Sequence, residues 1–242
     1  MTIKRFFITI AASVSALLLP LSGFSADYKL NVQNFKELRV VDGIAVDYCC
    51  HPDSAGWAVF TCDPDMASQI MFNNNKERLS VQTASEDGRI VEGTPRVRVY
   101  SSALCMVENS GDSTVVVHNL VPIQTFKAKL IGNGSIYVHG IHANSVEAGI
   151  VTGNGNIAID GKAQKAKYHN VGTGSISARN LDAAQVKCII ISNGKIECSA
   201  SKKLNIVGMG SGRVEYHGNP ESVSNSSIGV KAINADKTEV EP

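Results

Sequence analysis

The stretch Leu130–Gly140 reads LIGNGSIYVHG and places a Gly-Asn-Gly sequence between two apolar runs. A glycine-rich loop that binds phosphate leads into the N-terminus of a helix, whose backbone amides face the anion. Here Ile136 and Val138 alternate instead with polar and aromatic residues, which is the period of a β-strand. The glycines therefore predict a sharp corner between two strands, where positive φ angles are expected.

Four later segments repeat this pattern of strand, Gly-x-Gly turn and strand. Their turns start at Gly153, Gly172, Ser192 and Gly210, so the steps along the chain are 21, 19, 20 and 18 residues. A degenerate earlier copy starts at Asn109. The turn glycines assigned a structural role are Gly132, Gly134, Gly153, Gly155, Gly172, Gly174, Gly194, Gly210 and Gly212.

So short a unit cannot bury its own apolar side, but stacked units can, in parallel ladders about 4.8 Å apart. The predicted fold class is therefore all-β, a parallel β-helix-like solenoid with coils of about 20 residues. Thr152 fits as a one-residue insertion. The fourth and sixth residues after each turn start are assigned to the core: Ile136, Val138, Ile157, Ile159, Ile176, Ala178, Ile196, Cys198, Val214 and Tyr216.

The outward positions contain the candidate functional residues. Stacking places Glu197 beside Glu215, one coil apart, and paired carboxylates can serve in acid–base catalysis or bind calcium. Lys195 and Arg213 lie on the same face, so a charge-balanced solvated surface is the simpler interpretation.

A second outward pair is formed by His139 and Asp160, which can share a hydrogen bond. The sequence places no serine or cysteine nucleophile beside them. Glu197, Glu215, His139 and Asp160 are therefore kept as a candidate surface site, and we predict no catalytic residues, cofactor or metal.

The N-terminus has the layout of a secretory signal peptide. Lys4 and Arg5 precede an apolar run over 6–21, and small residues follow, with cleavage expected after Ser25. A membrane anchor is the alternative, but the run is short for a span and no second one follows. We expect an exported protein, located in the periplasm, on the outer surface or secreted.

The overall charge does not indicate a polyanionic partner. The formal net charge is +1 and 19% of residues are charged, so no strong field favours nucleic acid or an anionic membrane.

Six cysteines in an exported chain permit disulfides. A bridge from Cys49 or Cys50 to Cys62 across a hairpin is one prediction, and buried free thiols are the main alternative. Neighbouring strand residues point to opposite faces, so Cys49 and Cys50 do not readily share a metal. Cys188 and Cys198 both face the interior of one coil, either bridged or packed as thiols.

Residues 1–25 are assigned to the signal peptide and 26–233 to one β-solenoid domain, followed by a polar tail over 234–242 that is expected to fray. Within the domain, 26–105 form an irregular β part and 106–233 the repeat coils. The irregular part is expected to contain strands around a tight turn at Asp42-Gly43.

Three further elements are predicted. Helical spacing runs from Met66 to Ile70, and a turn at Asn73–Asn75 precedes a strand over Arg78–Thr83. A last strand is expected over Ser227–Ile233.

The order FKELRVVDGIAVDY, ERLSVQT, Gly-x-Gly repeats and GSGRVEYHGNP resembles a bacterial family. It is the putative auto-transporter adhesin, head GIN domain family, a domain of unknown function common in Bacteroidetes. The resemblance spans about 34–233 and is most specific at Gly210–Pro220. Ser192 departs from it by replacing a turn glycine, and so does the cysteine-rich stretch over Asp47–Cys62.

The resemblance implies a right-handed β-helix-like fold and export, while the adhesin label assigns no residues. The functional hypothesis is an exported binding or structural module, adhesin-like, whose partner is a cell-surface glycan or protein, or another copy through the coil ends. The alternative is a polysaccharide lyase or hydrolase that uses Glu197 and Glu215.

Overall fold

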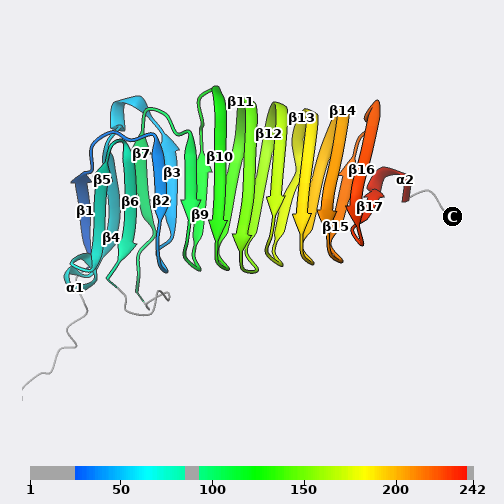
Figure 1. Cartoon of the computed structure of the whole chain (residues 1–242). Coiled ribbons are helices and arrows are strands. Elements are labelled where there is room, and N and C mark those ends of the chain that lie inside the picture. The colour runs from blue at the N-terminus through cyan, green and yellow to red at the C-terminus, as the bar shows by residue number, and fades with distance from the viewer. Residues whose placement is uncertain (1–24, 85–92, 239–242) are drawn as a thin grey trace, which may run out of the picture.

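The structure is a computed structural model that describes residues 25–84 and 93–238. The predicted signal peptide lies outside these residues, except for Ser25. The described chain forms a continuous sheet of 17 strands that winds as a β-solenoid of about 6 turns, with coils of roughly 20 residues (Figure 1). The predicted fold class is therefore confirmed.

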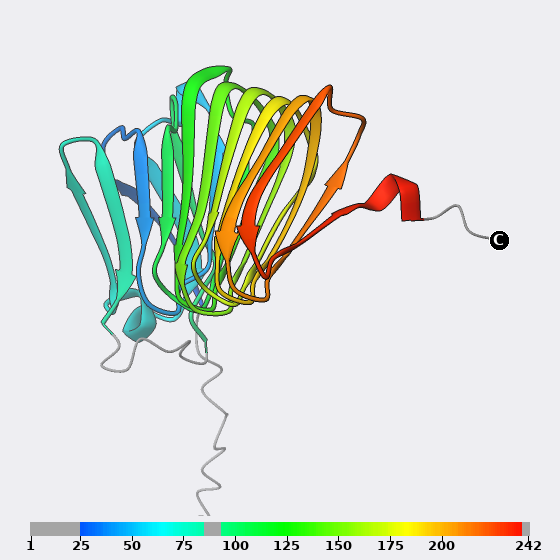
Figure 2. The same ribbon diagram turned by 45° about the vertical axis from the view of Figure 1, so that its right-hand side comes forward.

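Each coil contributes one strand to each of two faces, and the long strands bend from one face to the other at a corner (Figure 2). Face A contains β1 (Ala26–Asn31), β4 (Trp57–Cys62), β7 (Val97–Ser101), β3 (Val46–Cys50), β9 (Thr114–His118), the first parts of β11 (Ser135–Thr152), β12 (Asn156–Asn170), β13 (Ser175–Ile191) and β14 (Lys195–Met209), then β15 (Arg213–His217) and β17 (Lys231–Asn234). Face B contains β5 (Ile70–Asn75), β6 (Arg78–Thr83), β2 (Glu37–Val40), β8 (Met106–Asn109), β10 (Ile123–Ile131), the second parts of β11–β14, and β16 (Ser222–Ile228).

The core consists of inward columns in which equivalent residues of successive coils are in register. One column on face A is fully buried and consists of Val97, Val46, Val115, Ile136, Ile157, Ile176, Ile196 and Val214. Burying one such side chain contributes about 1.5–3 kcal/mol, so the aliphatic columns are the main source of stability. The predicted core residues are buried, except that Tyr216 is only partly buried because it lies near the end of the stack.

The turn glycines have two different physical roles, only one of which was expected. Gly153 has the positive φ predicted for a corner, at +90°. Gly155 does not, but a Cβ on it would lie 2.3 Å from the Gly134 carbonyl oxygen of the preceding coil. Positive φ is therefore the wrong reason for the second glycine of the turn, which is required by close backbone approach. Ser192 adopts a φ of +135° where other turns use glycine.

Two details of the repeat can be compared with expectation. Ile131 pairs with Thr152 after a one-residue shift, as the predicted insertion requires. The earlier copy that starts at Asn109 is in register with the stretch Leu130–Gly140, because Leu130 is level with Asn109 and Ser135 with Thr114, so its turn begins at Gly111.

The first coil lies out of chain order. β2 pairs in parallel with both β6 and β8, and β3 pairs with both β7 and β9. The coil over Glu37–Cys50 is therefore inserted between the coil that contains β6 and β7 and the coil that contains β8 and β9 (Figure 1). Asp42-Gly43 forms a solenoid corner that joins the two faces, and the strands on either side of it do not pair with each other.

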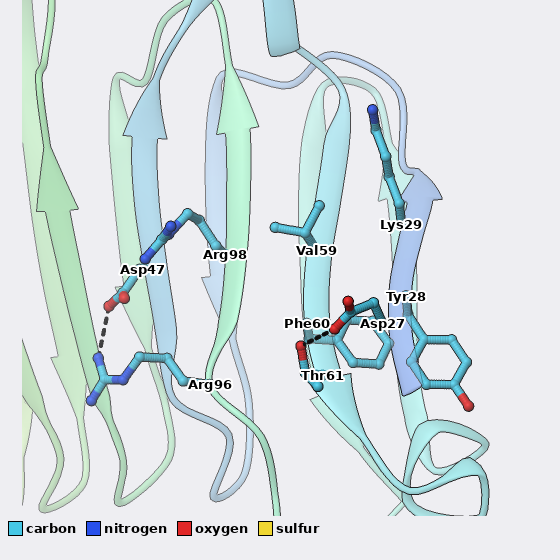
Figure 3. Close-up of a pocket in the computed structure, with 9 residues that line it drawn as sticks. All are labelled: Asp27, Tyr28, Lys29, Asp47, Val59, Phe60, Thr61, Arg96 and Arg98. Carbon is cyan, nitrogen blue, oxygen red and sulfur yellow. Dashed lines mark hydrogen bonds and ion pairs between the residues drawn. The ribbon is translucent and has the colours of Figure 1, made fainter. Parts of the chain in front are cut away.

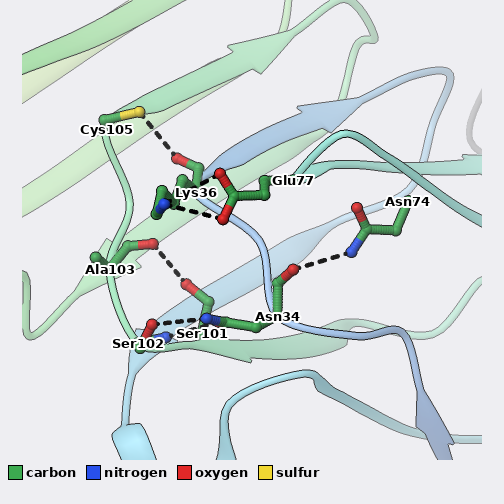
Figure 4. Close-up of polar contacts among 8 residues, drawn as sticks. All are labelled: Asn34, Lys36, Asn74, Glu77, Ser101, Ser102, Ala103 and Cys105. Carbon is green, nitrogen blue, oxygen red and sulfur yellow. Dashed lines mark hydrogen bonds and ion pairs between the residues drawn. The ribbon is translucent and has the colours of Figure 1, made fainter.

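Polar contacts hold this inserted coil in place (Figure 4). The Asn34 side chain donates to Ser102 Oγ at 2.8 Å and accepts from the Ser102 backbone amide at 3.1 Å. Asn74 Nδ2 donates to the Asn34 carbonyl at 3.2 Å, and Lys36 forms an ion pair with Glu77 at 2.9 Å. These contacts join the connection that leads into β2 to the β5–β6 hairpin and to the residue after β7, segments that lie far apart in the sequence.

The two ends of the stack are built differently. At the N-terminal end, β4 runs antiparallel to β7 and carries β1 at its outer edge, while β5 runs antiparallel to β6. At the other end, β16 and β17 have no strand on their outer sides within the described residues.

Several local expectations are corrected. The turn between β5 and β6 lies at Lys76-Glu77, where both φ angles are positive, and Asn73–Asn75 belong to β5. The short helix α1 covers Pro64–Ala67, and a single 3₁₀ turn covers Pro52–Ser54.

The C-terminal segment also differs from expectation. It forms two strands, β16 and β17, rather than one strand over Ser227–Ile233. The helix α2 (Ala235–Thr238) follows in the part expected to fray.

Candidate functional site

The predicted carboxylate pair is formed and lies on face A. Glu197 is directly opposite Glu215 in the ladder between β14 and β15. Lys195 Nζ lies 2.7 Å from Glu215 and 3.1 Å from Glu197, and Arg213 lies 3.2 Å from Glu215. Ser177 also donates to Glu197 at 3.1 Å. The four charges thus form a network that is neutral overall.

This network suits structure better than catalysis. The hydrogen bond from Lys195, followed by that from Arg213, lowers the pKa of Glu215 below its usual value. The hydrogen bond to Glu215 in turn raises the pKa of Lys195. A general acid at neutral pH requires the opposite shift, a carboxyl group with a raised pKa. We therefore interpret this network as a surface ion-pair ladder.

The predicted pair of His139 and Asp160 is also formed. His139 Nδ1 lies 2.8 Å from Asp160 Oδ2, and the Gly140 amide donates to Asp160 Oδ1 at 2.7 Å. His118 of the preceding coil stacks on the His139 ring, with centroids 5.5 Å apart. Asp160 thus satisfies a backbone amide at the corner where β11 turns from face A to face B.

The same arrangement recurs at the end of the stack, where sequence reasoning missed it. His217 Nδ1 lies 2.7 Å from Asp236 in α2, and the Gly218 amide donates to Asp236 at 2.7 Å. The signal was present in the sequence, since His-Gly occurs at 139–140 and at 217–218, each followed about one coil later by aspartate. Asp236 was overlooked because it lies in the segment assigned to the tail. A motif used twice at corners indicates a structural role.

The cysteines are free thiols in the described part of the chain. The hairpin expected between Cys50 and Cys62 is absent, because β7 lies between β3 and β4. Cys50 is level with Ser101 at one end of β7, whereas β4 passes Val99 and Arg98 before it reaches Cys62.

The sulfur atoms of the cysteines have different neighbours in the structure. Cys50 Sγ instead donates to the Ser102 carbonyl at 3.2 Å, and Cys49 lies on the opposite side of the same strand. A disulfide of Cys62 with Cys49 or Cys50 stays a prediction without the hairpin that motivated it. Cys188 and Cys198 face each other across the core, with their sulfur atoms 3.8 Å apart.

A groove that the sequence did not predict lies on face A between β4 and β7 (Figure 3). These strands pair only at Ala58–Val99 and Val59–Arg98, and they then diverge. The groove has a volume of about 450 Å³ and is lined by Asp27, Tyr28, Lys29, Asp47, Val59, Phe60, Thr61, Arg96 and Arg98.

One wall of this groove is basic and the other is mixed. Arg96 forms an ion pair with Asp47 at 2.7 Å, whereas Arg98 forms none within the described residues. On the facing wall Thr61 donates to Asp27 at 2.6 Å beside the ring of Phe60. An arginine head group of this kind binds carboxylate, phosphate or sulfate through paired N–H donors.

The sequence signal for this wall is the spacing of two arginines. In Arg96-Val97-Arg98 the arginines lie two residues apart, so a strand projects both from the same side. The facing wall comes from β4 and β1, whose placement depends on antiparallel pairing at the end of the stack. The sequence alone therefore offered no reason to bring these walls together.

A second concave surface runs over the corners that lead into face B. It has a volume of about 640 Å³ and is lined mainly by polar residues between Pro122 and Lys202, including His142, Lys162 and Asp182.

Two negative findings apply to residues 25–84 and 93–238 only. No group of three or more His, Cys, Asp or Glu side chains is arranged to hold a metal ion there. None of their helices is long and apolar enough to cross a membrane.

Comparison with solved structures shows the same fold. A putative adhesin from Bacteroides fragilis superimposes with a TM-score of 0.78 at 19% identity, covering 88% of this chain and 98% of that chain. A putative adhesin from Parabacteroides merdae gives 0.68 at 20% identity, covering 88% and 98%. A protein from Parabacteroides distasonis described as a putative lipid binding protein gives 0.69 at 18% identity, again covering 88% and 98%.

Curated proteins yield no match. The sequence does match a family model, described as "Putative auto-transporter adhesin, head GIN domain", over residues 34–220. That interval begins just before β2 and ends just after β15, so it contains the inserted coil, the repeat coils as far as β15, and the groove residues other than those of β1. The chain belongs to the family of putative auto-transporter adhesins with a head GIN domain.

Proposed function

We propose that this protein is an exported, non-catalytic binding module of the adhesin type that acts in the periplasm or at the cell surface. The observation that carries the proposal is the groove between β4 and β7, with Arg98, which forms no ion pair within the described residues, on its wall. Both walls of the groove are strands of one hydrogen-bonded sheet, so it presents its side chains with little loss of entropy on binding. The predicted signal peptide and the family description support the export and adhesin parts.

The chemistry of the groove favours a ligand that carries an anionic group. Arg98 offers several N–H donors in one plane, whereas Phe60, at 5% exposure, belongs to the core beneath the groove. A carboxylated or sulfated glycan of a cell surface supplies such anionic groups for the arginine. A surface protein is the other partner class in this proposal.

The ion-paired state of Glu197 and Glu215 is the reason not to propose a polysaccharide lyase or hydrolase. Both carboxylates accept from Lys195, at 3.1 and 2.7 Å, and the lowered pKa of Glu215 disfavours proton donation by it.

The test is a binding assay on purified residues 26–242 against a glycan array and cell-surface extracts, with and without calcium. We expect saturable binding that Arg98→Gln weakens by about tenfold or more, because one charge-assisted pair contributes about 1.5–3 kcal/mol. Arg213→Gln is the matched control, since Arg213 is also exposed on face A but pairs with Glu215 away from the groove.

Equal loss in both variants would mean that binding follows overall charge and not the groove. Absence of saturable binding under every condition would contradict the proposed function. In that case pairing of coil ends between copies becomes the leading hypothesis, and the mass in solution would decide it.

A further inference from the structure

Face B carries a continuous row of exposed apolar side chains. In the described residues, five of the nine exposed large hydrophobic side chains fall in this one row. They are Val151, Val171, Ile191, Met209 and Ile228, with exposed fractions of 46, 43, 45, 61 and 75%. We name these five residues the apolar stripe.

The register makes the stripe contiguous. Met209 lies opposite Ile191 on one side and opposite Ile228 on the other. Val151 and Val171 follow Ile150 and Asn170, which are themselves paired, so they extend the row by two coils. With neighbouring strands about 4.8 Å apart, the stripe spans roughly 19 Å. A monomeric soluble protein seldom leaves such a row open unless it binds something.

Beside the stripe, the same face carries four lysines that we name the lysine field: Lys165, Lys167, Lys187 and Lys203. None of them forms an ion pair within the described residues. They line a shallow depression of about 310 Å³, together with Glu147 at its β11 edge. Desolvation is the main cause of the lowered pKa of the neighbouring His169; the charges of Lys167 and Lys187 lower it further, and that of Glu147 opposes them.

The rest of face B is balanced in charge, which makes the lysine field a local feature. Arg78 pairs with Glu37 at 2.6 Å, Lys129 with Glu108 at 3.1 Å and Lys127 with Glu147 at 3.6 Å. The carboxylates thus stop at β11, one coil before the lysine field begins at β12.

We propose that the part of face B formed by β12, β13, β14 and β16 docks on an anionic lipid bilayer. Lysines next to an exposed apolar surface are the combination that holds a protein in the plane of a membrane interface. The long lysine stems lie along the apolar boundary while their ammonium groups reach the lipid phosphates. The stripe then enters the boundary between head groups and acyl chains.

The combination favours a bilayer over two other occupants. A soluble polyanion such as an acidic polysaccharide satisfies the lysines but leaves the stripe in water. A second copy of the chain covers the stripe but brings two lysine fields together, which is unfavourable. Only a surface that is both anionic and apolar matches both features.

This inference goes beyond the proposed function and does not depend on it. The docking surface lies on face B, whereas the Arg98 groove lies on face A, which faces the opposite way. A chain docked through face B would present its groove away from the membrane.

The experiment is co-sedimentation of residues 26–242 with vesicles of phosphatidylglycerol and phosphatidylcholine in equal parts, compared with phosphatidylcholine alone. We expect binding to the mixed vesicles only, and a decrease as salt rises. Lys167→Gln with Lys187→Gln should weaken it about 25-fold, because each lysine near an anionic surface contributes about fivefold. Ile191→Ser with Met209→Ser should weaken it by about tenfold or more.

Matched controls lie on the same face. Arg78→Gln removes a face B cation that is paired with Glu37 far from the lysine field, and Met71→Ser removes an exposed apolar side chain of β5 outside the stripe. Both should bind like the unmodified chain, and Arg98→Gln should leave vesicle binding unchanged. Circular dichroism spectra checked before each assay ensure that only folded variants are compared.

Three outcomes would overturn the inference. The first is absence of binding to the mixed vesicles. The second is binding that the lysine variants weaken but the apolar variants do not, together with competition by a soluble polyanion, which would indicate an acidic polymer as the ligand. The third is a dimer in solution that Ile191→Ser with Met209→Ser converts to monomer, which would assign the stripe to a second copy.

Discussion

At the scale of single residues, glycines set the spacing between coils, because the lack of a Cβ lets the backbones of successive coils approach closely. Gly174 has no side chain, and its backbone lies so close to the preceding coil that a Cβ would lie 2.1 Å from the Gly155 carbonyl oxygen. Inward asparagines complete the corners. Asn170 Nδ2 donates to the Gly174 carbonyl at 2.8 Å and to the Lys195 carbonyl at 3.3 Å, which joins two successive coils. Asn109 makes the equivalent pair of contacts three coils earlier in the turn that begins at Gly111.

Gly174→Ala should therefore lower the free energy of unfolding by about 1–3 kcal/mol, because the added methyl group has to displace the backbone of the preceding coil. Gly149→Ala is the matched control. Its Cβ would meet only His169 at 3.7 Å, an ordinary contact, and its φ is not positive. That variant should be neutral or gain about 0.5 kcal/mol from a less flexible unfolded chain.

Urea unfolding monitored by circular dichroism compares the two alanine variants. Equal midpoints would contradict the close backbone approach between coils.

At the scale of secondary-structure elements, α2 is held by one carboxylate. Asp236 accepts from the Gly218 amide and from His217, and the first of these contacts is the main cause of its lowered pKa. No comparable polar anchor joins α2 to β16 in the described residues. The attachment of α2 to the last coil should therefore depend on the charge of Asp236 more than on packing.

Acid should release α2 before the coils unfold. A carboxyl group whose pKa is lowered by folding contributes stability above its unfolded pKa, about 3.9, and loses it as pH falls through the lower folded value. Hydrogen exchange at the Gly218 amide should therefore be slow at pH 7 and accelerate, relative to other β15 amides, below about pH 4.

Asp236→Asn should show the faster relative exchange already at pH 7. Glu221→Gln is a control for removing an exposed carboxylate nearby. If Gly218 exchanges alike in both variants, Asp236 does not hold the helix.

At the scale of the whole molecule, each coil contacts mainly its immediate neighbours, as in other solenoids. β13 packs between β12 and β14, whereas β16 has β14 on one side and an open edge on the other within the described residues. Its sequence, SVSNSSI, carries no charge and no proline, the usual means of protecting an edge strand.

Native-state hydrogen exchange should follow this asymmetry. Amides of β12 and β13 should exchange slowest and those of β16 fastest, because an end coil opens with the loss of only one interface. Uniform protection along the stack would show instead that the coils open as one unit. Protection of β16 that increases with protein concentration would indicate pairing of coil ends between copies.

The local repeat explains how much of the fold and of the candidate site could be predicted from the sequence. The alternation around Ile136 and the recurring Gly-x-Gly steps require stacked coils, because no other arrangement buries one apolar side from every unit. The same alternation placed Glu197 beside Glu215 and His139 beside Asp160. These pairs could be predicted because each depends on only one step of the repeat.

The inserted coil and the Arg98 groove could not be predicted in this way. Both depend on long-range pairing, of β2 with β8 and of β4 with β7, across segments that have no shared period. The free energy of such pairings comes from backbone hydrogen bonds and burial that any strand of similar length can provide. A sequence pattern therefore does not select among them.

The lysine field could not be predicted from the charge of the sequence either. A net charge of +1 describes a chain without a strong overall field, and Lys167, Lys187 and Lys203 are unremarkable when read along it. Their concentration depends on which residues share a face and which carboxylates fall beyond reach. The amino-acid sequence determined the coil, because that needs only local alternation, whereas the tertiary structure alone decided the surfaces, because stacking brings together residues that lie one coil or more apart.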